Sequence, residues 1–129
     1  VIFDSSQIPD EIFDLMVVHE DVYQSRRQEV CEVAQQWFNT LEYIRQAPDD
    51  AAARMGKRLG VTARDYRNMA AGIITPTRAD NLRLLAGNAP AIVAPAHNLV
   101  NVMLAEGQLK KHVAIDSALD SGLAGCIAR

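Results

Sequence analysis

Three histidines are the first candidates for metal or acid–base chemistry, at His19, His97 and His112. They lie far apart along the chain, no two form a His-Glu-x-x-His pair, and no cysteine stands at a ligand spacing from any of them. Zinc sites are recognised by such close pairings of ligands. We therefore expect each histidine to be a surface or capping residue, and we expect neither a metal ion nor a cofactor.

The sequence also contains no complete motif for a catalytic nucleophile or a phosphate-binding loop. Ser5 and Ser6 lack the Gly-x-Ser-x-Gly context that exposes a catalytic serine. Gly56-Lys57 resembles part of a phosphate-binding loop, but Arg58 stands where that loop requires Ser or Thr, and Ala51 stands where it requires glycine. The sequence therefore favours a protein that is not an enzyme.

The two cysteines, Cys31 and Cys126, form no Cys-x-x-Cys motif. Cys31 falls in a stretch with helical periodicity, where a thiol behaves as a small apolar side chain. Cys126 lies in the expected C-terminal tail. We expect two unpaired thiols, and a disulfide between them stays open as the alternative because spacing alone cannot establish one.

Composition narrows the class of protein. The 129 residues suffice for one domain, and 49% apolar content makes a buried core feasible. The net charge is only −3, and the basic pairs Arg26-Arg27, Lys57-Arg58 and Lys110-Lys111 are typical of solvated surface, so we expect no nucleic-acid binding. The apolar runs are too short to cross a bilayer. The first residues lack the pattern of a signal peptide, as would those of a mature exported protein.

The N-terminal part of the chain is expected to form two strands. Residues 1–3 are apolar and lead into a loop that holds Pro9, and residues 12–18 form a second apolar run rich in branched side chains. Such a run is typical of a strand buried on both faces. Two strands alone make no stable sheet in water, so the sequence suggests that further strands are missing.

From residue 25 onward the pattern is helical. Asp49, in the pair Asp49-Asp50, is expected to cap the second helix, and Thr62 and Thr77 open capping patterns with acids three residues later. Pro95 is expected in a first turn or at a kink. The expected helices cover about 26–46, 50–59, 62–72, 77–87 and 90–106, with a last turn from Asp116 that includes Leu119.

The first of these helices carries an apolar stripe that fixes which face is buried. Its members recur at steps of three and four residues, which places them on one side of a helix: Val30, Val33, Ala34, Trp37, Leu41 and Ile44. Trp37 and Tyr43 could instead mark a stacking platform for a ligand. At this spacing a core role is favoured, and we expect Trp37 to be buried.

The order of these elements resembles a known family. The segments "VIFDSSQIPDEIFDLMVVHEDV", "WFNTLEYI", "APDDAAARMGKRLGVTARDY", "TRADNLRLL" and "LAEGQLKK…IDSALD" follow one another as in the C-terminal part of the substrate-binding proteins of nitrate, sulfonate and taurine ABC transporters. That family is related to the thiamine-precursor-binding proteins. Each motif is weak alone, but their order over nearly the whole chain is more specific.

The resemblance implies an α/β fold of two lobes, the periplasmic-binding-protein fold, with ligand in the cleft between them. Residues 1–129 would be a single, mostly helical C-terminal fragment, with about two strands in 1–24 and about five helices in 25–129. Asp4, Ser5 and Ser6, in the loop after the first strand, are its candidate ligand-binding residues. The glycine-rich start and the other ligand-contacting segments of the family are absent from this chain.

Two functions are therefore expected. In the first, the chain is part of a periplasmic or lipid-anchored receptor that captures a small molecule for import and docks on an ABC-transporter permease. The alternative is a free-standing helical interaction or sensor module. Either way, the unpaired edge of residues 12–18 favours self-association, most simply as a homodimer.

Overall fold

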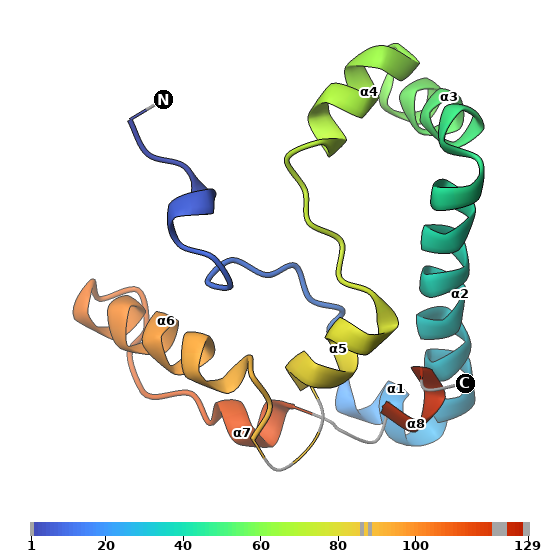
Figure 1. Cartoon of the computed structure of the whole chain (residues 1–129). Helices are drawn as coiled ribbons and strands as arrows, with labels where there is room; N and C mark the ends of the chain where they lie inside the picture. Colours follow the sequence, from blue (N-terminus) through green and yellow to red (C-terminus); the bar gives the residue numbers. More distant parts are fainter. Residues whose placement is uncertain (1, 86, 88, 120–123, 128–129) are drawn as a thin grey trace.

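The computed structural model describes residues 2–85, 87, 89–119 and 124–127. Within these ranges every regular element is helical (Figure 1), as expected for most of the chain. In this part of the chain no helix is long and apolar enough to span a membrane. The elements are a 3-10 turn, η1 (Ser5–Gln7), then α1 (Glu20–Ser25), α2 (Arg27–Gln46), α3 (Pro48–Leu59), α4 (Ala63–Ala70), α5 (Arg78–Leu85), α6 (Val93–Ala105), α7 (Ile115–Ala118) and α8 (Ala124–Ile127).

The two N-terminal strands predicted from the sequence are wrong for the residues that are described. Val1 lies outside them, whereas residues 2–3 and 12–18 form neither a helix nor a strand. Part of the region assigned to strands, residues 1–24, is instead the start of helix α1. The physical reason is that a strand needs hydrogen-bonding neighbours, which local sequence does not supply.

Helix α2 is the longest element and organises its neighbours. It ends at Gln46, just before Ala47-Pro48, because the residue preceding a proline is disfavoured in helical geometry. Its buried residues are Val30, Ala34 and Phe38. Figure 1 shows α3 and α4 at one end of α2, and α1 and α8 at the other.

The burial of Trp37 predicted from the apolar stripe is also wrong. The Trp37 side chain is 56% exposed and Val33 is 60% exposed, whereas the adjacent Phe38 is only 8% exposed. The helix buries a narrower face than the stripe suggested, and this face runs through Val30, Ala34 and Phe38. A stripe read at steps of three and four can accommodate either neighbour, and tertiary packing decides between them.

Helices α3 and α4 form a tight hairpin. Gly60 ends α3 in the left-handed conformation, with φ of 71°, and Thr62 caps α4 by accepting a hydrogen bond from the Asp65 amide, both as predicted. Asp49 is not the cap of α3. Ala47 takes that position and Pro48 follows as the first helical residue, where its missing N–H costs nothing.

Helix α5 begins at the capping pattern predicted for Thr77 and Asp80. The Thr77 hydroxyl accepts from the Asp80 amide at 3.2 Å, and the Asp80 carboxylate accepts from the Thr77 amide at 3.0 Å, which opens α5 as predicted. Pro95 falls in the first turn of α6. The predicted end of α5 at Ala86 and the connection at Asn88 lie on residues outside the described ranges.

The C-terminal helix α8 packs against both α2 and α5. Ile127 belongs to a small apolar cluster with Ala34 and Phe38, against which Leu41 and Leu82 pack. A disulfide joins Cys31 on α2 to Cys126 on α8, with their Cα atoms 5.3 Å apart. The expectation of two unpaired thiols is therefore wrong, since the fold brings together two cysteines that lie 95 positions apart.

Candidate functional site

Asp4, Ser5 and Ser6, the candidate ligand-binding residues, form one compact turn. The Asp4 carboxylate accepts a hydrogen bond from the Ser6 amide at 3.0 Å and one from the Ser6 hydroxyl at 2.5 Å. The backbone closes the turn, because the Gln7 amide donates to the Asp4 carbonyl at 3.1 Å. These bonds hold the Ser6 hydroxyl toward the Asp4 carboxylate, so the local sequence explains this turn completely.

The charge of this turn follows from the same contacts. The hydrogen bond from the Ser6 hydroxyl, and then that from the Ser6 amide, lower the pKa of Asp4 below its ordinary value. All three residues are exposed. The structure thus gathers the three predicted residues on one exposed loop.

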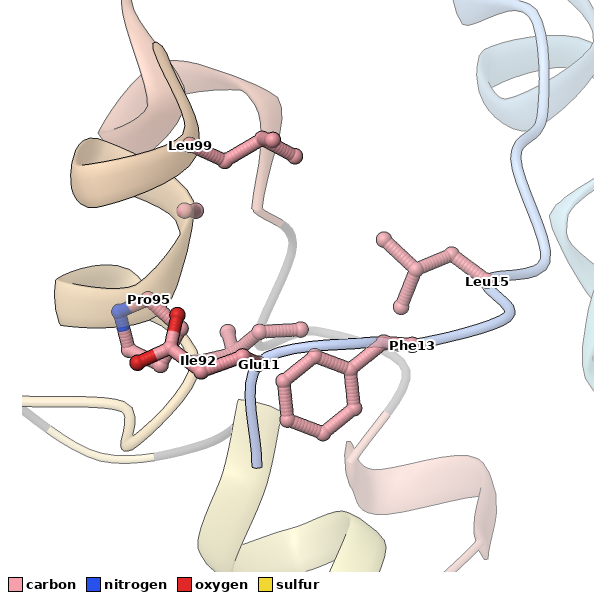
Figure 2. A pocket seen from close by; sticks show the side chains of 7 residues that line it. Glu11, Phe13, Leu15, Ile92, Pro95 and Leu99 are labelled. Carbon is pink, nitrogen blue, oxygen red and sulfur yellow. The ribbon is translucent and has the colours of Figure 1, made fainter. Parts of the chain in front are cut away.

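A shallow hollow lies between the N-terminal segment and α6 (Figure 2). Its volume is about 90 Å³, well below that of typical ligand pockets, which begin at about 300 Å³. Phe13 and Leu15 face it from the N-terminal segment, and Pro95 and Leu99 face it from α6. Its full lining is Glu11, Phe13, Leu15, Ile92, Pro95, Ala96 and Leu99.

The chemistry of this hollow does not suit an anion. Glu11 is the one charged residue among the lining side chains, and its carboxylate would repel nitrate or a sulfonate. The lining also excludes Asp4, Ser5 and Ser6. The hollow is therefore an incompletely covered apolar contact rather than a continuation of the predicted ligand loop.

His19 and His97 contact nearby groups, and His112 lies in the irregular segment between α6 and α7. The Nδ1 atom of His19 caps α1 by accepting from the Asp21 amide at 3.4 Å. The Nε2 atom of His97 lies 3.6 Å from the Asp116 carboxylate, which joins α6 to α7. That pairing was not visible in the sequence, where the two residues are 19 positions apart. Among the described residues no group of three or more potential ligands could hold a metal ion.

The carboxylate pair Asp49-Asp50 serves the packing of helices. Asp49 accepts from Arg67 at 2.8 Å, which ties α3 to α4. Asp50 accepts from the Tyr43 hydroxyl and from Arg54, the latter at 2.7 Å. These partners account for both carboxylates. Gly56-Lys57 lies inside α3, as expected, and is not a phosphate loop.

No protein-family model, no curated protein and no solved structure matches the chain.

Proposed function

We propose that the chain is the C-terminal part of an exported, non-catalytic substrate-binding protein that captures a small molecule for import by an ABC transporter. In this proposal the molecule is a sulfonate, nitrate, taurine or a related compound. The whole protein would have two α/β lobes, and this chain would supply the closing helices of one lobe.

The observation that carries the proposal is the bare apolar segment at residues 12–18. Ile12, Leu15, Met16 and Val17 are each more than half exposed, and Val17 is 86% exposed. Isolated exposed apolar side chains are common, but a consecutive run of branched and large ones in water is unfavourable. Such a run is expected where another part of a larger protein covers it.

Two further features support this reading. The helices of the chain follow one another in the order that the resemblance implies, and Thr62 and Thr77 cap two of them. The disulfide between Cys31 and Cys126 is consistent with an oxidising compartment outside the cytoplasm. Both features agree with an exported receptor, whether periplasmic or lipid-anchored.

The proposed mechanism is lobe closure around the ligand, followed by docking on the permease. In it the turn of Asp4, Ser5 and Ser6 forms one wall of the cleft, and the Ser5 hydroxyl is the donor to an anionic group. Asp4 accepts hydrogen bonds from both the Ser6 hydroxyl and the Ser6 amide, and these bonds fix the turn that presents Ser5. The opposite wall would come from the remainder of the protein.

Calorimetry with the protein at its native length tests the function. Nitrate, taurine and aliphatic sulfonates should include at least one ligand that gives a saturable isotherm, and the 129-residue chain alone should give no heat of binding. Ser5→Ala should weaken binding about tenfold, since it removes a hydrogen bond to a charged group. Ser25→Ala, on α1, is the matched control and should bind normally.

Two outcomes would reject this proposal. One is the absence of binding by the native-length protein for every compound tested. The other is tight binding by the 129-residue chain alone, which would mean that no second wall is needed.

The second candidate is a free-standing helical interaction module, and the helical architecture of the described residues favours it. Exposed apolar side chains on α2 and α6, namely Val33, Trp37, Leu99 and Val102, would then contact a protein partner. A native polypeptide no longer than this chain would favour this candidate over the receptor.

A further inference from the structure

The C-terminal helix α8 is fastened to the rest of the molecule by a small set of long-range contacts. The disulfide joins Cys126 to Cys31 on α2. Next to it, the Gln35 side-chain amide donates to the Cys126 carbonyl at 3.0 Å. From α5, the Arg78 guanidinium donates to the Ile127 carbonyl at 3.1 Å. These contacts bring α8 against two helices that are distant in sequence.

Ile127 is the side chain of α8 that covers the apolar surface of α2, and it is called the plug below. It is only 7% exposed and packs with Ala34 and Phe38. The Arg78 guanidinium also lies over the Phe38 ring, 4.7 Å from its centre, so one side chain contacts both the plug and the surface that it covers. Without Ile127, the apolar surface formed by Ala34, Phe38, Leu41 and Leu82 would lose part of its cover.

The disulfide is the strongest element of this attachment. Helix α8 has four residues, far too few to be stable by itself in water. One buried side chain and two hydrogen bonds hold a tethered segment weakly, because ordering its backbone opposes them. Cys31 and Cys126 are both half-buried rather than enclosed, which leaves the bond within reach of a small dithiol.

We propose that the Cys31–Cys126 disulfide is a redox-controlled clasp that opens and closes an apolar surface on α2 and α5. In the oxidised protein α8 is docked and Ile127 covers that surface. When the bond is reduced, α8 leaves and the surface of Ala34, Phe38, Leu41 and Leu82 becomes exposed to solvent. This inference goes beyond ligand capture and does not depend on it.

The chemistry of the clasp is thiol–disulfide exchange. A thiolate of an external dithiol attacks one sulfur of the disulfide, a mixed disulfide forms, and the second thiol of the reagent resolves it. The Cys31–Cys126 bond gains two electrons and two protons and becomes two thiols, while the dithiol becomes a disulfide. A disulfide reagent such as oxidised glutathione drives the reverse reaction.

Hydrogen exchange and dye binding on the full chain test the clasp. The oxidised chain should titrate with no free thiol. On reduction with dithiothreitol, amide exchange in residues 124–127 should quicken by about tenfold or more, as expected for a locally opened segment. The emission of an apolar-surface dye should rise several-fold, and both signals should return with oxidised glutathione.

Two variants separate the clasp from its plug. Cys126→Ser should show the reduced behaviour under both conditions, with no response to dithiothreitol. Ile127→Ala keeps both cysteines, so it should remain oxidised and yet bind more dye than the wild type before reduction.

Three results would overturn the proposal. The first is two titratable thiols in the unreduced protein. The second is unchanged exchange in residues 124–127 after reduction, which would mean that docking does not depend on the bond. The third is a loss of the helical circular dichroism signal on reduction. That result would mean that the disulfide stabilises the whole fold rather than the docking of α8 alone.

Discussion

Trp37 and Phe38 are adjacent on α2 and have opposite environments. Phe38 is buried against Ala34 and Ile127, whereas more than half of Trp37 is in contact with water. The apolar periodicity of this helix pointed to the larger ring as the core residue. The positions of α5 and α8, which no local pattern reveals, select Phe38 instead.

Truncating these two rings should therefore have unequal effects on stability. Phe38→Ala should lower the free energy of unfolding by about 3 kcal/mol, since it leaves a cavity in the cluster. Trp37→Ala should change it by no more than about 0.5 kcal/mol. Urea unfolding followed by circular dichroism measures both values, and the wild-type Trp37 emission maximum should be close to that of tryptophan in water. A larger loss for Trp37→Ala would contradict this assignment.

Gly56 shows how a small residue can be required inside a helix. A Cβ atom built there would lie 2.9 Å from the Val61 carbonyl oxygen and 3.1 Å from backbone atoms of Thr62. Backbone of this kind cannot move aside as a flexible side chain would. The close approach of the turn after α3 therefore depends on the absence of a side chain at this position.

We predict that Gly56→Ala destabilises the chain by about 1–3 kcal/mol, as overpacking does. Without a clash the same change would stabilise the helix by up to about 1 kcal/mol, so the sign of the effect is diagnostic. Gly72→Ala is the matched control, because nothing lies within 4 Å of its added Cβ atom. Thermal or urea unfolding measures both, and a more stable Gly56→Ala variant would refute the close packing.

At the scale of elements, a three-residue cluster connects α2 to α3. The Asp50 carboxylate accepts hydrogen bonds from the Tyr43 hydroxyl and from Arg54. The Tyr43 bond first, and the Arg54 bond second, lower the pKa of Asp50. Because the folded-state pKa lies below the unfolded value, this contribution to stability is present above the unfolded pKa and is lost as the pH falls through the folded one.

Removing the tyrosine hydroxyl should therefore change the acid titration of Asp50. In Tyr43→Phe its pKa should move upward, toward the ordinary value of about 3.9, and stability should begin to decline at a higher pH than in the wild type. Carboxyl-carbon NMR across an acid titration measures the pKa directly. Tyr66→Phe, on α4, is the control, since Tyr66 is not among the groups that shift the pKa of Asp50. An equal shift in both variants would contradict the assignment.

The elements that the sequence predicted well are those with local signals. Pro48, Gly60, Thr62 and Thr77 each act within four residues, through a fixed φ, a left-handed turn or a capping hydrogen bond. The bounds of α2 followed from its periodicity and from Pro48. The turn of Asp4 to Ser6 is also local, so its residues could be gathered without knowledge of the fold.

What could not be predicted depends on contacts distant in sequence. Residues 12–18 have the composition of a strand, but a strand exists only where another one pairs with it. The Cys31–Cys126 bond required two helices to meet across 95 positions. Helix α8 itself is too short to leave a periodic signal and depends on that meeting.

At the scale of the whole molecule, the exposed apolar side chains make self-association the expected behaviour. The segment from Ile12 to Val17 and the outer face of α2 at Trp37 offer apolar area that a second copy could cover. Light scattering across a dilution series should show a concentration-dependent rise to a dimer or a larger species. Ile12→Lys together with Val17→Lys should reduce it, whereas Lys110→Glu, which leaves the apolar segment intact, should not. A monomer at every concentration would contradict this prediction.

The proposed membership of this chain in a larger exported receptor is best tested on the native polypeptide. An antibody raised against residues 27–59, which cover α2 and α3, would be used to probe fractionated cells of the source. We expect a polypeptide much longer than 129 residues in the extracytoplasmic fraction, and its mobility should change on reduction of its disulfide. A 129-residue polypeptide confined to the cytoplasm, with both cysteines reduced, would contradict it.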